Sequence, residues 1–149
     1  MNVALRPARS TDAGTTGAIL TRFQQDTGWL PDLYTGAETI AFCGEMIDRG
    51  WVTVAVQAGR VIGFIARDGQ EVCALYVSGP ASGKKVGQRL LQDAKTRSDR
   101  LWLRVFQANT GAQRFYLRAG FDEVGRGDGA DNEESLPDIS YVWQREGAI

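Results

Sequence analysis

The most constraining feature of this sequence is an apolar segment that runs into a loop of small and basic residues and then into a helix. The apolar run ends at Val77, the loop occupies 78–85, and amphipathic spacing begins near Val86. A loop of this kind aims unpaired backbone N–H groups and the positive end of a helix dipole at one point. The sequence therefore predicts a strand–loop–helix unit over 75–91 that is suited to bind an anion, most often a phosphate.

Composition narrows the classes of protein that this unit can belong to. The chain has 149 residues, of which 43% are hydrophobic and 23% charged, so we expect a single soluble domain over residues 1–149. A formal net charge of −1 argues against a nucleic-acid partner. There is no histidine, and Cys43 and Cys73 are far apart, so we expect no metal site and two buried, reduced thiols. No apolar run approaches the length of a membrane span, so we expect a cytoplasmic protein without a membrane partner.

The apolar periodicity predicts an alternation of hairpins and helices. The helix from Val86 should bury Val86, Leu90, Leu91 and Ala94 on one face. Further helices are expected after Ser10 or Thr11, over 37–48, and from Asn109 or Thr110 to Gly120, with a polar loop over 125–134. The predicted strands are 3–7, 51–56, 61–66, 71–77, 101–106, 121–124 and 139–143. Because hairpins fill the first half and crossover helices the second, this order predicts a mixed α+β sheet.

A second motif lies downstream of the loop. Asn109, Ala112, Phe115, Tyr116, Gly120 and Phe121 follow the spacing N-x-x-A-x-x-F-Y-x-x-x-G-F. With the strand–loop–helix unit and the order of elements, this motif resembles the GNAT superfamily of acetyl-CoA-dependent N-acetyltransferases, from Leu5 to Trp143. The resemblance implies a mostly antiparallel central sheet flanked by helices, with a splayed strand pair that holds acyl-CoA.

The resemblance also implies which residues bind acetyl-CoA. The strand would pair with the pantetheine arm, the loop and helix start would bind the pyrophosphate, and the second motif would contact the arm. These residues are Leu75, Tyr76, Val77, Gly83, Lys84, Lys85, Val86, Gly87, Gln88, Asn109 and Ala112. Lys85 stands where the family usually has a glycine, and Ser82 stands near the usual Arg or Gln. We expect Lys85 to avoid positive φ, with its side chain pointing away and its N–H facing the phosphate.

Tyr116 is the candidate general acid. A phenol with a pKa near ~10 can donate a proton to a thiolate whose conjugate acid has a pKa of about 8.5. In this interpretation Phe115 belongs to the core and Tyr116 faces the cleft. The alternative is that Tyr116 only packs its helix against the sheet.

The candidate base is Glu71, on the strand that precedes the loop. A substrate ammonium with a pKa near ~10 is only about one part in a thousand neutral at pH 7, so its proton must be accepted. Glu71 could equally be a solvated carboxylate. Glu133, Glu134 and Asp138 in the late polar segment, or a chain of water molecules, are the alternatives.

The acceptor amine is the least constrained part of the interpretation. Trp29, Tyr34 and Phe42 could form an aromatic lid over an organic amine or could be core residues. The acidic run 131–134, with Glu133 in its centre, could recognise a cationic acceptor or be solvated. The resemblance implies acetyl transfer in a ternary complex to an amine of a small molecule or protein. A non-catalytic acyl-CoA-binding or regulatory module, an interaction domain, and a homodimer through the final strands remain open.

Overall fold

The computed structural model describes residues 2–147, and its internal contacts divide the chain into two compact units. Unit 1 comprises the chain up to Asp68 together with Val72–Ala94. Unit 2 comprises Gly69–Glu71 and the chain from Lys95 onward. The expectation of a single domain over 1–149 stays a prediction. Residues 1, 148 and 149 of that range lie outside the described residues.

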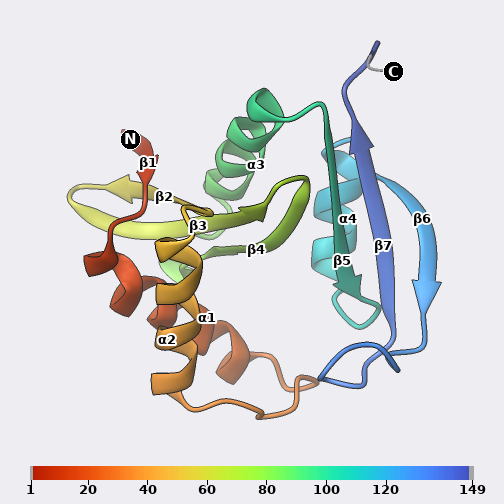
Figure 1. Cartoon of the computed structure of the whole chain (residues 1–149), viewed down its shortest axis with the longest axis horizontal. Coiled ribbons are helices and arrows are strands. Elements are labelled where there is room, and N and C mark those ends of the chain that lie inside the picture. The colour runs from red at the N-terminus through yellow and green to blue at the C-terminus, as the bar shows by residue number, and fades with distance from the viewer. Residues whose placement is uncertain (1, 148–149) are drawn as a thin grey trace. The chain divides into compact units, whose positions relative to one another are not determined.

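The fold class predicted from the sequence is confirmed: the protein is α+β, with seven mostly antiparallel strands in the order β1-β2-β3-β4-β5-β7-β6 (Figure 1). The element order is also as predicted, with two short 3-10 helices added. The elements are β1 Val3–Pro7, η1 Ser10–Asp12, α1 Ala13–Asp26, α2 Gly36–Asp48, β2 Val52–Gln57, β3 Arg60–Asp68, β4 Glu71–Val77, η2 Gly79–Ala81, α3 Val86–Arg97, β5 Arg100–Phe106, α4 Thr110–Arg118, β6 Asp122–Gly127 and β7 Asp138–Gln144. Among the described residues, none of these helices combines the length and the hydropathy that a bilayer span requires.

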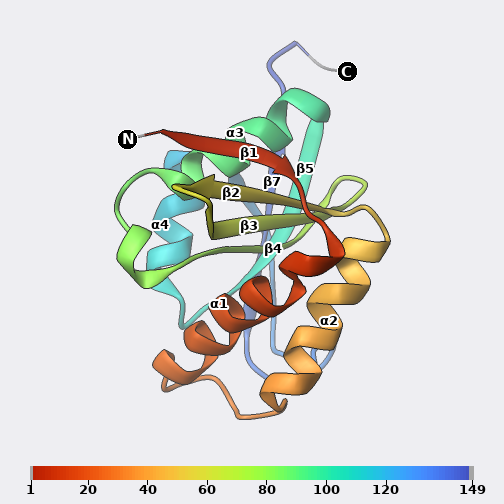
Figure 2. The ribbon, with the colours of Figure 1, turned by 90° about the vertical axis from the view of Figure 1, so that its left-hand side faces the viewer.

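In unit 1, α1 and α2 lie on one side of β1–β4 and α3 lies on the other (Figure 2). The larger core forms between the α1–α2 pair and the strands; it contains Ile19, Leu20, Cys43, Met46, Ile47, Val52, Val54, Phe64, Ala66 and Ala74. The helix pair is closely packed because Gly17 of α1 has no side chain: a Cβ there would stand 2.9 Å from the Cα of Ile40. A capping box begins α2, in which Thr35 and Glu38 each bind the other's backbone N–H.

The predicted apolar face of α3 is confirmed residue by residue, since Val86, Leu90, Leu91 and Ala94 are its buried positions. Val86 begins the helix and packs against β3 where Gly63 leaves room for it. A Cβ on Gly63 would lie 3.3 Å from Cγ1 of Val86 and 3.1 Å from the carbonyl oxygen of Tyr76. The start of α3 is thus fixed against the strands by burial of Val86.

In unit 2, α4 lies along one face of β5, β7 and β6 (Figure 1). The buried residues Leu101, Leu103 and Val105 of β5 alternate with Trp102, Arg104 and Phe106, so the strand has one covered face and one more open face. Strand β6 reaches Gly127, where a loop from residue 125 was predicted, because its pairing with β7 resumes at Gly125 after a register shift. Lys95 connects the end of α4 to β7. Its ammonium donates to the carbonyl of Ala119 and lies 5.1 Å from the ring centroid of Trp143.

Candidate active site

The loop between β4 and α3 is a series of tight turns. Ala81 N donates to Ser78 O at 3.0 Å and Lys84 N donates to Ala81 O at 3.3 Å. Gly83 has φ +80° and Lys85 has φ +64°. The expectation that Lys85 avoids positive φ is therefore wrong: the loop needs a left-handed residue here to turn into α3, and the lysine adopts that conformation at an energetic cost.

This backbone suits an anion. Left-handed residues alternating with right-handed ones turn successive N–H groups toward a common point. Arg89 N donates to Lys85 O at 3.1 Å, which is the bond that joins the loop to α3. The backbone N–H groups of the residues before Arg89 have no carbonyl one turn earlier in the helix to which they could donate. The side chains of Lys84 and Lys85 next to these groups are exposed, whereas the guanidinium of Arg89 donates to Val3 O of β1. Backbone donors, a helix dipole and cationic side chains together fit the diphosphate of a nucleotide cofactor.

The predicted pantetheine strand is half-buried along Leu75, Tyr76 and Val77. Tyr76 is anchored on the α1 side, with ring centroids 4.9 Å from Phe23 and 5.9 Å from Phe64. These contacts fix the direction of the strand that enters the loop.

In unit 2, Asn109 is the N-cap of α4, and its side-chain oxygen accepts from Ala112 N at 3.0 Å. The capping role considered from the sequence is confirmed. The side-chain NH2 group is not used by this bond, so Asn109 keeps donors for a ligand.

Tyr116 has a different environment from the one predicted. Its side chain is 8% exposed, whereas Phe115 is only half-buried, so the assignment of Phe115 to the core and of Tyr116 to an open cleft is wrong. The Tyr116 ring lies 5.4 Å from Phe121 and 6.5 Å from Tyr141, between α4 and the sheet. Residue 116 is the buried position of this nine-residue helix, because it faces the rings of Phe121 and Tyr141.

Glu71 begins β4 and is half-buried. It pairs in parallel with Trp102 of β5, and Trp102 N donates to Gln70 O at 3.0 Å. Cross-strand partners project to the same face of a sheet. Glu71 therefore belongs to the Trp102 and Arg104 face, opposite the face that α4 and Tyr116 cover. The two candidate proton-transfer groups lie on opposite faces of unit 2.

The remaining predicted positions have mixed outcomes. Tyr34 and Phe42 are exposed, at 39% and 52%, so they are not core residues; Trp29 is half-buried. Glu133 is exposed in the loop between β6 and β7. Cys43 is a buried thiol whose pKa is raised by burial, as expected, but Cys73 is exposed, because it projects from the less covered side of β4.

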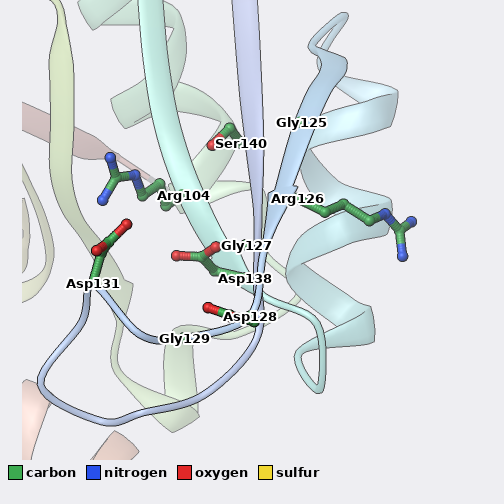
Figure 3. Close-up of a pocket in the computed structure, with 9 residues that line it drawn as sticks. All are labelled: Arg104, Gly125, Arg126, Gly127, Asp128, Gly129, Asp131, Asp138 and Ser140. Carbon is green, nitrogen blue, oxygen red and sulfur yellow. The ribbon is translucent and has the colours of Figure 1, made fainter.

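A hollow of about 220 Å³ lies on the more open face of unit 2 and was not predicted (Figure 3). Arg104 of β5 is paired with Ser140 of β7, which is paired with Gly125 of β6, and Asp138 is paired with Gly127 in the next row. The small residues form the floor, and the loop that carries Asp128 and Asp131 closes one end; the lining residues are Arg104, Gly125, Arg126, Gly127, Asp128, Gly129, Asp131, Asp138 and Ser140. The alternation of β5 could have indicated Arg104. The depth of the hollow depends on strand pairing that the sequence does not show.

The sequence matches the family described as acetyltransferase (GNAT) domain over residues 39–133. It is 29% identical over 93 residues to peptidyl-lysine N-acetyltransferase YjaB of Salmonella typhimurium, and this match covers 62% of the chain and 63% of that protein. It is 33% identical over 87 residues to peptidyl-lysine N-acetyltransferase YiaC of Escherichia coli, covering 57% of the chain and 58% of that protein. The chain thus spans less than two thirds of the length of these curated relatives.

Solved structures extend the likeness over nearly the whole fold. The solution structure of apo YjaB from Escherichia coli superposes with a TM-score of 0.81 at 25% identity, covering 96% of this chain and 98% of that one. The fold is also that of YncA from Salmonella typhimurium, which was solved with acetyl-CoA (TM-score 0.74, 17% identity, 100% and 97% covered). With the tight-turned loop before α3 and the Asn109–Phe121 motif on α4, the chain belongs to the GNAT acetyltransferase family.

Proposed function

We propose that this protein transfers the acetyl group of acetyl-CoA to a primary amine, by direct attack of the amine on the thioester. The observation that carries the proposal is the backbone of the loop before α3, where Gly83 and Lys85 both adopt positive φ and the N–H groups at the helix start have no carbonyl one turn earlier in the helix. Family membership supports the same assignment.

In this proposal the chain holds acetyl-CoA mainly through its backbone. The N–H groups of Lys85 to Gln88 bind the pyrophosphate, since Lys84 N–H already donates to Ala81 O, and Leu75 to Val77 pair with the amides of the pantetheine arm. The spare amide donors of Asn109 contribute a further hydrogen bond to the arm, beside Ala112. Because backbone groups do this binding, the replacement of the usual glycine by Lys85 keeps the donor that the phosphate needs. The splayed strand pair expected for the arm stays a prediction.

The chemical step needs a base and an acid. Glu71 first accepts one proton from the ammonium, so that the neutral amine attacks the thioester carbon. As the N–C bond forms and the C–S bond breaks, the thiolate sulfur takes the phenol proton of Tyr116, and the second proton of the attacking nitrogen returns to the phenolate of Tyr116. Because Glu71 and Tyr116 lie on opposite faces of unit 2, we propose that the proton of the ammonium reaches Glu71 through water, while Tyr116 serves the leaving sulfur. The packing of Tyr116 against Phe121 and Tyr141 limits its movement, as a positioned acid requires.

The acceptor that we propose is the side-chain amine of a lysine in a protein or peptide. This class comes from the names of the curated relatives YjaB and YiaC. Tyr34 and Phe42, which are exposed together with Leu33 and Ile40, offer apolar surface for such an acceptor. We also propose a cytoplasmic location, because both cysteines are free thiols, which is typical of reducing compartments.

The test combines acetyl-CoA calorimetry with thiol release in the presence of lysine peptides. Tyr116→Phe should lower kcat about 100-fold or more while leaving the Kd for acetyl-CoA nearly unchanged. Tyr141→Phe is the matched control, because it removes a hydroxyl from the neighbouring buried ring and should leave kcat within about twofold.

Three results would separate the proposal from its alternatives. Acetyl-CoA binding without acetylation of any amine would indicate a non-catalytic module of the same fold. Normal acetyl-CoA affinity in Gly87→Glu would contradict the loop as the pyrophosphate site. An unaltered acidic limb of the pH–rate profile in Glu71→Gln would assign the base to another group.

A further inference from the structure

The hollow of unit 2 has an unbalanced set of charges. The guanidinium of Arg126 is paired with Glu123 through two hydrogen bonds of 2.9 Å, and it points away from the hollow (Figure 3). This pairing leaves Arg104 as the single unneutralised cation among the lining residues, against the carboxylates of Asp128, Asp131 and Asp138. The hollow is therefore net negative and favours a cation.

Two of these charged groups have no charged partner within the part of the chain that the structure describes. The guanidinium of Arg104 forms no ion pair there and lies 5.9 Å from the ring centroid of Trp102. The carboxylate of Asp131 forms no hydrogen bond or ion pair with residues 2–147. Figure 3 shows the Arg104 and Asp131 side chains on the same side of the hollow, facing the space between β5 and the loop.

The wall that carries Asp131 is held in place by the loop itself. Asn132 donates to Leu136 O at 2.8 Å and accepts from Leu136 N at 3.1 Å, which closes the loop on itself. Gly129, with φ +92°, packs so closely that a Cβ would stand 2.6 Å from the backbone of Leu136. On the floor, a Cβ at Gly127 would stand 2.5 Å from Oδ1 of Asp138. A side chain at Gly129 or Gly127 would therefore not fit without movement of its neighbours, which keeps the loop and the floor closely packed.

Its size and its donor set restrict the occupant. A volume of about 220 Å³ lies below the ~300–1,000 Å³ of sites for drug-sized ligands, so the hollow accommodates a side chain and not a nucleotide. Within residues 2–147, no cluster of His, Cys, Asp or Glu is arranged to hold a metal ion. An organic cation, an ammonium or a guanidinium, remains as the group that fits.

The hollow also shares a face with the proposed base. Glu71 pairs with Trp102, and Arg104 and Ser140 occupy the next row on that face. Residues two apart on a strand are about 7 Å apart, which is also the distance between same-side residues of an extended peptide. A lysine presented to Glu71 would therefore bring the residue two positions away over the row of Arg104 and Ser140, from which an extended Arg or Lys side chain reaches toward Asp138, one row further along β7.

We propose that this hollow is a specificity site that binds a second cationic side chain of the acceptor, an Arg or Lys two residues from the acetylated lysine. Asp131 and Asp138 contact the cation, and Arg104 excludes an acidic residue from the same place. The proposal rests on the proposed acetylation of lysine peptides. It adds that this enzyme selects its lysines by local positive charge.

The experiment compares two peptides that have a single acceptor lysine and differ at one position, two residues away. One peptide carries arginine there, and the other carries citrulline, which keeps the shape and removes the charge. We expect kcat/KM for the arginine peptide to be about fivefold higher at low salt, and the preference to shrink as ionic strength rises. The D131N variant should reduce the preference to about twofold or less. The control D122N removes an exposed carboxylate of β6 that does not line the hollow, and it should leave the preference unchanged.

Equal kcat/KM for the two peptides, with both acetylated, overturns the specificity site and leaves the proposed function intact. If neither peptide is acetylated, the proposed function fails, and direct binding decides about the hollow. Amide NMR signals of Gly125, Gly127 and Ser140 should then shift on titration with the arginine peptide and not with the citrulline peptide. Absence of these shifts overturns the proposal whatever the activity.

Discussion

Helices α1 and α2 of unit 1 approach each other closely at Gly17. Because of this contact, we expect replacement of glycine by alanine to lower the stability of the protein at position 17 and to raise it at position 44. A Cβ at Gly17 would lie 2.6 Å from Cγ1 and 2.9 Å from the Cα of Ile40. Ordinary carbon contacts are about 3.5–4.0 Å, so the backbone of α2 would have to move by roughly 0.6 Å or more. Overpacking of this kind costs about 1–3 kcal/mol.

The same substitution also has a favourable component. Alanine in place of glycine inside a helix contributes about 1 kcal/mol through backbone entropy. For Gly17→Ala the steric cost exceeds this gain, and we expect a net loss of about 1 kcal/mol. At Gly44 of α2 the nearest atom would be the Cβ of Ala13 at 3.7 Å, an ordinary contact, so Gly44→Ala should stabilise by about 1 kcal/mol. Gly14→Ala, where nothing lies within 4 Å, should be neutral or stabilising.

Urea unfolding measures this difference directly. With an m-value of roughly 2 kcal/mol/M, the expected separation of about 2 kcal/mol between Gly17→Ala and Gly44→Ala corresponds to midpoints about 1 M apart. Equal m-values would show that the native state has changed its stability and not its compactness. If Gly17→Ala is as stable as Gly44→Ala, the close approach of α1 to Ile40 is refuted.

Three further changes test other parts of the structure. Lys85→Gly should raise the free energy of unfolding by about 0.5–1 kcal/mol, because it relieves a left-handed lysine at φ +64°, without weakening acetyl-CoA binding; a lower melting temperature would show that the lysine side chain is needed. Asp12, which accepts from Arg6 at 2.7 Å and from Arg9 N at 2.7 Å, has its pKa lowered mainly by the hydrogen bond from Arg6. Its contribution of about 2 kcal/mol should be fully present above the unfolded-state pKa of about 3.9 and lost as pH falls through the lower folded-state pKa. Stability curves of wild type and Asp12→Asn should therefore converge only in acid, and a constant difference down to pH 2 would contradict this cause. Lys95→Met should lower stability by about 1 kcal/mol, because the ammonium that binds Ala119 O at the end of α4 is lost; an unchanged thermal midpoint would show that the cap contributes nothing.

The features that the sequence predicted correctly each depend on the preferences of a short segment of chain. The buried face of α3 follows from 3.6-residue spacing, and the cap at Asn109 follows from the preference of its side chain for the helix start.

Errors arose where neighbours distant in sequence decide the outcome. Tyr116 is buried and Phe115 is only half-buried, because the rings of Phe121 and Tyr141 lie on the side of α4 that residue 116 faces. Cys73 is exposed because its side of β4 is the less covered one. Lys85 adopts positive φ because the chain must turn at that residue for Val86 to reach Gly63.

The sequence by itself determined the order of elements, the loop between β4 and α3, and the motif of α4, because backbone preference and periodicity are properties of short segments. Only the tertiary structure decided which face of unit 2 carries Glu71 and which carries Tyr116, since a face is defined by strand pairing. It also created the hollow beside Arg104, where Gly125, Gly127 and Ser140 come together from strands paired across the loop between β6 and β7. The negative charge of the acidic segment is visible in the sequence. The hollow that Asp131 lines is not, because it depends on which small residues the paired strands bring together on its floor.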